Sequence, residues 1–565
     1  MTSTTVPARA TRTDPPTGTA DAVTAHTLLN CLIREVSAPE HQATVDGGRL
    51  LVRLPRRDLL LRARLRRVSM IGAHRFHGPV ERLDDDGIWA AVGWRELAGY
   101  IQEELELRTG VANSEFLEQV ADSHETIRTA LEHRAGGMPR QDLYLASEQS
   151  LVFGHRFHPT PKARTGDPAD WLAYGPETGA RLRLRHLAVR RRLVRQEGDL
   201  SALDALCPSA DPEFVTLPVH PWQFRLLSRH ERLRAAMTAG DVVDGGVSGP
   251  EWVPTASVRT LYQRDADTFL KFSLNVRLTN CVRRHASYEL SGAVALNRLV
   301  QPVMAGLAER FPTSALLAEP GYRTLAADGG DTTLLEGLGV IVRSGLRDHL
   351  RPGVTPLLAA AVADEYPTSA AHVSHLLARG DGDVLPWWDA YLGLLLPPVL
   401  AAYFDHGVVL EPHLQNVVVA VNPDGTPAQM IFRDLEGTKL LPRPHEQALA
   451  ALPEDIRGPL VYDAERGWNR VVYCLLVNHV AEVLGALADL DPAREPALWG
   501  LVRDHLGACA RAAGHPPRLR ALLSGVPLPA KANLLLRWSR RADRHATYVP
   551  LTSPLGADFP REVHL

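Results

Sequence analysis

The stretch VVVAVNPDGTPAQMIF (417–432) predicts a β-hairpin, because two apolar runs flank the turn sequence NPDGTP. A hairpin places the residues just before its first strand beside those just after its second. Five polar residues are expected to converge at this open end: His413, Gln415, Asn416, Asp434 and Glu436. Protein kinases hold Mg²⁺ against phosphates with an Asn and an Asp arranged in this way. The pattern therefore predicts a nucleotide and magnesium site.

A second hairpin is predicted within residues 254–284, where TASVRTLY and TFLKFSL flank a polar turn around 263–267. In this pairing Ser257 and Arg259 share one face, and Lys271 lies opposite the Arg259–Thr260 region. Facing cations destabilise a strand pair unless an anion lies between them. The combined hydroxyls, guanidinium and ammonium suit a polyphosphate. Further along the chain, four residues supply donors suited to a carboxylate: Thr279, Asn280, Arg283 and Arg284.

Lysine is rare in this chain: only four of the 62 basic residues are lysines, at positions 162, 271, 439 and 531. Since arginine serves almost everywhere else, the remaining lysines are expected where a compact, flexible ammonium is needed. Three of them lie in unusual motifs. Lys531 is predicted at the start of an apolar helix, where a cation is unfavourable unless an anion is near. Arg343, in GVIVRSG, is a further single candidate.

The loop GHRFHPTPKARTG (154–166) concentrates donors in a short segment: His155, Arg156, His158, Lys162 and Arg164. Its two prolines exclude a continuing helix, and no cysteine or carboxylate lies close enough in sequence to complete a zinc site. The composition favours an anion as the ligand. A basic surface loop is equally compatible with this segment taken alone.

The length of 565 residues exceeds what one hydrophobic core serves, so several packed units are expected. A helix is predicted at 26–38, strands to about 72, helices around 93–135, strand pairs between about 215 and 285, and mostly helix beyond 350. The fold class is therefore α+β and multi-domain. Residues 1–24 lack an apolar segment and are expected to form a disordered tail.

Several classes of function lose support from the sequence. There is no GK of a Walker loop and no HExxH, GxSxG or GxGxxG motif. The formal charge of −3 argues against general nucleic-acid binding. The apolar run 390–404 carries two prolines and falls short of the ~20 residues of a membrane span, so no membrane anchor is expected. Five dispersed cysteines without CxxC predict reduced thiols and a cytoplasmic location.

Taken in order, five motifs resemble those of the IucA/IucC family, the siderophore synthetases that work independently of non-ribosomal peptide synthetases. They are GHRFHPTPKARTG, SVRT with Lys271 fourteen residues on, LTNCVRR, HLQN and RDLEG. The resemblance runs from about residue 26 to residue 540. One departure is Leu414, where the family commonly has a glycine, so the backbone beside His413 is less certain.

The resemblance implies a cupped-hand fold, usually dimeric, so a homodimer is expected. Its parts are a thumb (25–165), fingers with the ATP-phosphate hairpin (166–350) and a palm with the kinase-like hairpin (351–565). It also implies a reaction: ATP activates a carboxylate, in many members citrate, to an acyl-adenylate with release of pyrophosphate. An amine or hydroxyl then attacks, giving an amide or ester and AMP. The partners are thus small molecules, and the cofactors are ATP and Mg²⁺.

The resemblance also implies site residues. ATP is assigned to His158, Lys162, Arg164, Ser257, Arg259, Thr260, Lys271, Gln415 and Asn416. The metal is assigned to Asn416 and Asp434. The carboxylate substrate is assigned to Thr279, Asn280, Arg283, Arg343, His413 and Lys531. Catalytic roles fall to Lys271, Arg283 and His413, with His413 the one candidate for a general base.

Three alternatives stay open. The same chemistry can act on a citryl or succinyl monoamide instead of citrate. The Asn416/Asp434 pair also fits a kinase-like phosphotransferase, whose product would be ADP. A non-catalytic metal-binding protein built on the histidine-containing loop is the third.

Overall fold

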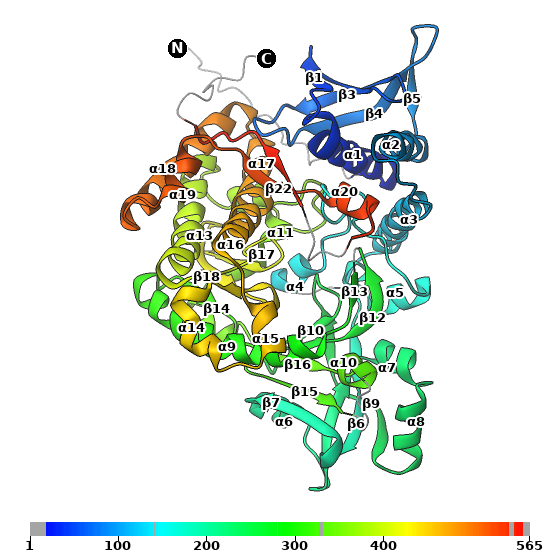
Figure 1. Ribbon diagram of the computed structural model, residues 1–565, viewed down its shortest axis with the longest axis vertical. Helices are drawn as coiled ribbons and strands as arrows, with labels where there is room; N and C mark the ends of the chain where they lie inside the picture. The colour runs from blue at the N-terminus through cyan, green and yellow to red at the C-terminus, as the bar shows by residue number, and fades with distance from the viewer. Residues whose placement is uncertain (1–17, 140–141, 280, 327–331, 542–546, 557–565) are drawn as a thin grey trace, which may run out of the picture.

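The structure is a computed structural model that describes residues 18–139, 142–279, 281–326, 332–541 and 547–556. Helices and sheets mix along the chain, which confirms the α+β prediction. Figure 1 shows a small sheet at one end of the molecule, a larger sheet at the other, and a mainly helical layer beside and between them.

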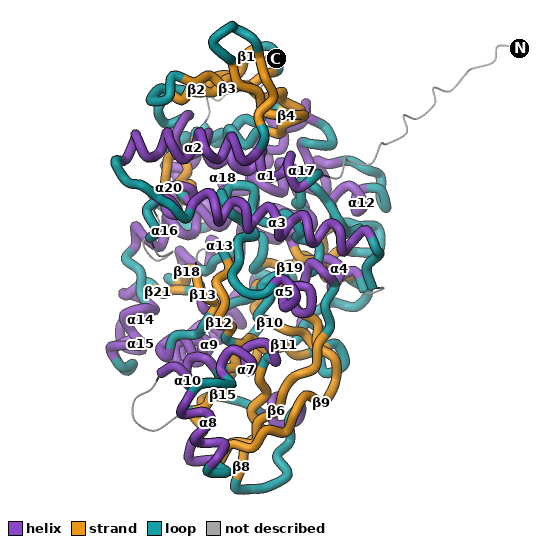
Figure 2. Tube along the Cα trace, turned by 90° about the vertical axis from the view of Figure 1, so that its right-hand side faces the viewer, coloured by secondary structure: helices purple, strands orange, loops and turns teal. Residues whose placement is uncertain are grey.

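The five-stranded sheet is an antiparallel meander in the order β1-β2-β3-β4-β5. Its strands are Ala43–Asp46, Arg49–Leu54, Leu59–Arg67, Arg75–Leu83 and Trp89–Val92. The alternating Arg and Leu of β2 and β3 place one row of side chains inward, as the sequence pattern predicts. Helices α1 (Ala20–Leu32) and α2 (Trp94–Thr109) cover the inner face, and α3 (Phe116–Ala135) lies beyond α2 (Figure 2).

The larger sheet has eight strands in the order β7-β15-β16-β11-β10-β9-β6-β8, all neighbours antiparallel. Their bounds are β6 Leu182–Arg190, β7 Val194–Gly198, β8 Phe214–Val219, β9 Val242–Pro254, β10 Thr260–Gln263, β11 Thr268–Phe272, β15 Gly321–Leu325 and β16 Val340–Ser344. Helices α7 (Pro221–Leu227), α8 (Glu231–Thr238) and α10 (Thr332–Gly337) complete this unit. The small β12–β13 pair (Leu274–Leu278, Cys281–Arg283) follows β11 directly.

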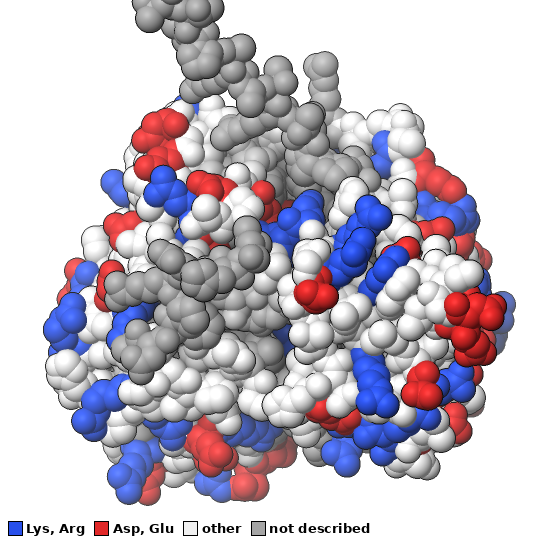
Figure 3. All heavy atoms as spheres, turned by 90° about the horizontal axis from the view of Figure 1, so that it is seen from above, with Lys and Arg blue, Asp and Glu red and all other residues white. Residues whose placement is uncertain are grey.

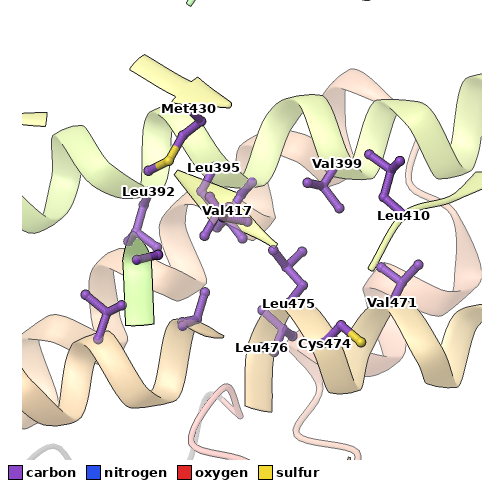
Figure 4. Packing of buried hydrophobic residues seen from close by; sticks show 14 of the residues in the cluster. Leu392, Leu395, Val399, Leu410, Val417, Met430, Val471, Cys474, Leu475 and Leu476 are labelled. Atoms are coloured by element: carbon purple, nitrogen blue, oxygen red, sulfur yellow. The ribbon is translucent and has the colours of Figure 1, made fainter. Parts of the chain in front are cut away.

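A third sheet, in the order β14-β20-β19-β17, is built around the predicted hairpin of β19 (Val417–Val421) and β20 (Pro427–Phe432). Its edges are β14 (Ser314–Leu316) and β17 (Thr355–Leu358). Long helices pack on it: α9 (Ser287–Arg310), α13 (Val384–His406), α16 (Ala464–Val472), α17 (Ala481–Ala488) and α18 (Glu495–Ala512), with the π-helical segment η6 (Tyr473–Val480) joining α16 to α17. In Figure 4 Val417 of the hairpin lies between α13 and the α16–η6 segment, and Met430 lies beside α13. This apolar packing fixes the open end of the hairpin.

Two helical segments, Val384–His406 and Ala464–Ala488, are long and apolar enough to cross a membrane by length and composition. The first contains the run 390–404 and continues through both prolines, so it is longer than the sequence analysis predicts. Most of each apolar window, 61% and 94%, is buried inside the protein. Packing in the hydrophobic core around the third sheet therefore accounts for their apolar character.

Segments near the two ends of the described chain pack against each other in the unit of the five-stranded sheet. α1 begins at Ala20, inside the predicted tail, whose remaining residues 1–17 lie outside the described residues. The short helix α20 (Asn533–Trp538) packs into the first core through Leu534 and Trp538. Glu35 receives hydrogen bonds of 2.9 Å from the backbone N–H groups of Leu534 and Leu535. The C-terminal segment thus connects the helical layer to the five-stranded sheet.

Candidate active site

The β10–β11 hairpin has the predicted register, with Thr260 paired to Lys271. Ser257 and Arg259, however, do not share a strand face, because residues 255–259 form a turn before β10. Val258 adopts a positive φ of 67° there, and the Ser257 Oγ accepts a 3.3 Å hydrogen bond from the N–H of Thr260. A β-branched residue in this conformation is strained. The turn aims the side chains of Ser257 and Arg259 by backbone geometry that the sequence pattern does not indicate.

Lys271 is buried and lies between two carboxylates. Its Nζ is 2.7 Å from Asp434 Oδ1 and 2.6 Å from Glu436 Oε2. Arg259 donates to the same Glu436 oxygen at 2.7 Å. Burial lowers the pKa of Lys271, but Asp434 and Glu436 outweigh it and raise that pKa above its usual value. The β19–β20 hairpin therefore supplies the anions that the facing cations of the β10–β11 hairpin require.

The open end of the β19–β20 hairpin is held by backbone and buried charges. The N–H of Arg433 donates to the Asn416 carbonyl at 3.0 Å, and the Arg433 guanidinium pairs with the fully buried Glu148. Asp434 follows with a positive φ of 77°, which turns the chain toward Lys271. The Asn416 side chain donates to the carbonyl of Glu411 at 3.3 Å. The predicted convergence of the two strand ends is observed, with Lys271 at its centre.

The 154–166 loop is a wall of the site and not a surface loop. The Thr165 N–H donates to Arg277 O and the Thr279 N–H to Ala163 O, so the loop is bound to the β12–β13 region. Lys162 Nζ is 2.5 Å from Glu177 Oε1, and the Arg164 guanidinium lies 4.2 Å above the ring of Trp171. The side chains of this wall face a shared interior.

That interior is one cavity of about 1000 Å³. Fifteen of the sixteen predicted site residues line it: His158, Lys162, Arg164, Ser257, Arg259, Thr260, Lys271, Thr279, Arg283, Arg343, His413, Gln415, Asn416, Asp434 and Lys531. The sixteenth, Asn280, lies outside the described residues. Arg284, also named with the carboxylate donors, is paired with Glu336 at 3.0 Å. Twelve Lys or Arg and eight Asp or Glu side chains line the cavity, so its net charge favours anions. On the outer face seen from above, acidic and basic side chains are interspersed (Figure 3).

Three of the carboxylate-binding candidates occupy settings that the sequence does not indicate. Lys531 ends strand β22 (Leu528–Lys531), not a helix, because α20 begins only at Asn533. Arg343 is buried and pairs with the fully buried Glu319 at 2.5 Å. Burial lowers the pKa of His413 to about 4, so its imidazole is neutral at pH 7. A neutral imidazole can accept a proton, but this pKa makes it a weak base.

The chain is similar to known protein families and to proteins of known activity. Residues 143–364 match the IucA / IucC family, and residues 385–546 match the family described as ferric iron reductase FhuF-like transporter. The rhizobactin siderophore biosynthesis protein RhbC of Rhizobium meliloti is 28% identical over 95% of this chain and 97% of its own. The L-2,3-diaminopropanoate–citrate ligase of Staphylococcus aureus is 30% identical over 65% of this chain and 66% of its own.

Among solved structures, the ATP-bound aerobactin synthetase IucA of a hypervirulent Klebsiella pneumoniae pathotype superposes with a TM-score of 0.84. It is 25% identical, and the match covers 95% of this chain and 100% of that one. The chain belongs to the IucA/IucC family. Two apolar helical segments, Val384–His406 and Ala464–Ala488, fall almost entirely within the range that matches the second family, and most of each apolar window is buried inside the protein.

The sequence analysis does not identify several residues that line this IucA/IucC site. Lys439, the fourth lysine, also lines the cavity and donates to the Glu436 carbonyl at 2.6 Å. Its motif carries no other unusual feature, but the lysine count alone would have identified it. Glu411 pairs with Arg470 of α16 at 2.5 Å. Since Arg470 is one of many arginines on a helical pattern, the sequence offers no signal for it.

The donor set fits a magnesium ion in one particular way. Among the described residues no group of three or more His, Cys, Asp and Glu side chains is positioned to hold a metal. Mg²⁺ commonly binds one or two carboxylates and completes its shell with waters and substrate phosphates. Asp434, Glu436 and the Asn416 amide offer that kind of oxygen site on the cavity wall. Glu436 is an additional candidate beyond the predicted pair of Asn416 and Asp434.

Proposed function

We propose that this protein is a siderophore-biosynthesis ligase that activates a carboxylate with ATP and Mg²⁺ and condenses the acyl-adenylate with an amine or hydroxyl. Citrate is the first candidate, because two of the relatives are named as citrate ligases. The products are the amide or ester, AMP and pyrophosphate. The observation that carries the proposal is the single cavity that collects cations of the β10–β11 hairpin and the 154–166 loop beside the carboxylates of the β19–β20 hairpin.

The cationic side chains that line the cavity suit an adenylation reaction. A carboxylate must approach the α-phosphate of ATP, so two anions have to be brought together. Cationic screening and positioning are then the main contributions of the protein. Lys271 and Arg259 hold the phosphates on one side, with Lys162 and His158 on the other. Arg283, Thr279, His413 and Lys531 hold the carboxylate substrate.

Asp434, Asn416 and Glu436 would hold Mg²⁺, which supplies charge neutralisation on the phosphate oxygens when bound. Burial alone would raise the pKa of Asp434. Lys271 and Arg343 outweigh burial and hold that pKa well below its usual range. Glu436 is likewise ionised, because Arg259 and Lys271 outweigh its burial and keep its pKa low. Both carboxylates are therefore anionic and ready to bind a cation across the physiological pH range.

The test is a pyrophosphate-release screen with citrate, 2-oxoglutarate and succinyl derivatives. Each carboxylate is combined with 1,3-diaminopropane, 1,5-diaminopentane, L-lysine or L-2,3-diaminopropanoate. We expect citrate-dependent pyrophosphate and AMP, together with an amide product detected by mass spectrometry. Activity confined to citryl or succinyl monoamides would move the reaction to a later intermediate. Carboxylate-dependent ADP without AMP would instead identify a phosphotransferase and reject the proposal.

We further propose that the three sheet-centred units are the thumb, fingers and palm of a cytoplasmic homodimer, with α9 and β14 of the 166–350 range joining the palm sheet. The support is the resemblance in motifs and the four described cysteines, Cys31, Cys207, Cys474 and Cys509, which are all free thiols. Light scattering coupled to gel filtration measures the oligomeric state. A mass of one chain, close to 61.9 kDa, would reject the dimer.

A further inference from the structure

Among the eight carboxylates that line the cavity, Asp364 and Glu289 lack a Lys or Arg partner within the described residues. Six of those eight lie within 4.0 Å of a Lys or Arg nitrogen: Glu177, Glu365, Glu411, Asp434, Glu436 and Glu482. A seventh, Glu289, accepts the backbone N–H of Ala286 at the start of α9. Asp364 has no Lys or Arg nitrogen within that distance among the described residues. The Asp364 carboxylate accepts a hydrogen bond of 3.2 Å from the backbone N–H of Tyr366.

The fold places Asp364 next to the adenylation machinery. It follows β17 and the short helix α11 (Ala359–Val362), and β17 pairs with β19 of the active-site hairpin. The N–H of Ala360 donates to the Leu414 carbonyl at 3.1 Å, which ties this segment to the His413–Asn416 turn. The side chains of His26 and Asn30 from α1 line the same cavity. Asp364 thus lies in a cavity that is bordered both by α1, which packs on the five-stranded sheet, and by the segment that follows β17 of the third sheet.

The wall around Asp364 is otherwise charge-balanced and aromatic. Glu365 pairs with Arg75 at 3.3 Å and lies 3.5 Å from Arg156. Tyr366 packs on Phe153 with ring centroids 5.2 Å apart, and its hydroxyl is 3.2 Å from His26 Nδ1. In a cavity whose surplus charge is positive, a carboxylate without a Lys or Arg partner, such as Asp364, is a place where a cation is favoured.

We propose that Asp364 binds the ammonium group of the second substrate, a primary amine, and takes its proton during condensation. This inference rests on the proposed function, since it assigns the nucleophile's place in that reaction. Primary amines are mostly protonated at neutral pH and are not nucleophilic in that form. A carboxylate contact attracts the cation, and transfer of one proton to Asp364 leaves the neutral amine beside the acyl-adenylate.

The step balances with the groups present. The lone pair of the amine nitrogen forms the C–N bond at the acyl carbon, and the bond between that carbon and the phosphate oxygen breaks. AMP leaves with the electron pair. One ammonium proton goes to the Asp364 carboxylate before attack, and the second is lost from the amide nitrogen to solvent after it.

The surroundings of Asp364 suit a proton acceptor that works near neutrality. Burial, together with the nearby Glu365, raises the pKa of Asp364 to about 7, although the Tyr366 N–H, Lys162 and Arg134 act in the opposite direction. A general base is most effective when its pKa lies near the working pH. His413, with a pKa of about 4, is less suited to this step.

The experiment separates the two half-reactions. Asp364→Asn is compared with wild type in carboxylate-dependent ATP–pyrophosphate exchange, in trapping of the adenylate by hydroxylamine, and in condensation with the best amine from the screen. Hydroxylamine is uncharged at neutral pH, so it needs neither a counterion nor a base. We expect kcat/KM for the amine to fall ~100-fold or more, in the range that general-base catalysis contributes, while exchange and trapping change far less. Asp364→Glu should recover part of the loss.

Asp265→Asn, the same substitution in the exposed turn between β10 and β11, is the matched control. It should condense the amine at the wild-type rate. In wild type kcat for the amine should rise with pH through about 7, and this rise should be absent in Asp364→Asn. Equal losses with hydroxylamine and amine, or normal amine condensation by Asp364→Asn, would overturn the proposal. A wild-type protein without exchange activity for any carboxylate would reject the proposed function instead.

Discussion

At the scale of single residues, the site is built from charges that already have partners. Lys271, Arg259 and Arg343 are buried against carboxylates, and the partly exposed Lys162 pairs with Glu177. Each cation is thereby fixed in position before a substrate enters. Preorganised charge of this kind contributes to catalysis because little rearrangement is needed at the moment of reaction.

Lys271→Ala tests this arrangement. We expect pyrophosphate exchange to fall at least ~100-fold, because a charge that stabilises the developing phosphate charge is removed. The free energy of unfolding should fall by about 1–3 kcal/mol, since Asp434 and Glu436 lose their shared partner. Urea unfolding and the exchange assay measure the two effects. A folded Lys271→Ala protein with normal exchange would remove Lys271 from the phosphate site.

At the scale of elements, the two hairpins show how far sequence reasoning extends. The NPDGTP turn and the alternation around Lys271 predict both hairpins and the Thr260–Lys271 pairing, because turn chemistry and apolar patterning are local properties. The turn at 255–259 is not predicted, since Val258 gives no local sign of a positive φ. Tertiary packing imposes that conformation. Asp364 is missed for a similar reason: its setting exists only once β17 pairs with β19.

Gly425→Ala tests the hairpin turn. Gly425 has a φ of +84°, and an added Cβ would lie 2.2 Å from the Leu376 carbonyl oxygen. The matched control is Gly353→Ala, with a φ of +81° and no atom within 4 Å of the added Cβ. The control should lose about 1–2 kcal/mol from the left-handed conformation. Gly425→Ala should lose a further 1–3 kcal/mol from the clash.

Urea unfolding of both variants measures this difference. Pyrophosphate exchange should fall more in Gly425→Ala than in Gly353→Ala, because the hairpin carries Asn416 and Asp434 at its other end. Equal stabilities for the two variants would show that the turn relaxes around the added methyl group.

At the scale of the whole molecule, buried ion pairs join the five-stranded sheet to the helical layer. Arg67 lies 2.5 Å from Glu495 and 2.7 Å from Asp489, and Arg75 lies 2.7 Å from Asp489. Both arginines are almost fully buried. These contacts connect segments more than 400 residues apart in sequence, so no local pattern indicates them.

Asp489→Asn should destabilise the protein by about 3–5 kcal/mol, because it leaves two buried guanidinium groups without a full counter-charge. Glu132→Gln is the control, since its pair with Arg128 on α3 is exposed. That change should cost less than about 1 kcal/mol. Thermal and urea unfolding measure both. Similar losses in the two variants would mean that the Arg67–Asp489–Arg75 group contributes no more than a surface pair.

The position of Lys271 between Asp434 and Glu436 has a consequence for the order in which ligands enter. The ammonium can turn to a phosphate only if the two carboxylates gain another cation, because otherwise they would repel each other and the incoming nucleotide. A divalent ion that bound together with ATP would provide that charge, and both salt bridges would then exchange partners in one event. Nucleotide affinity should then depend steeply on the divalent ion, and the metal-free nucleotide should compete poorly with the complex.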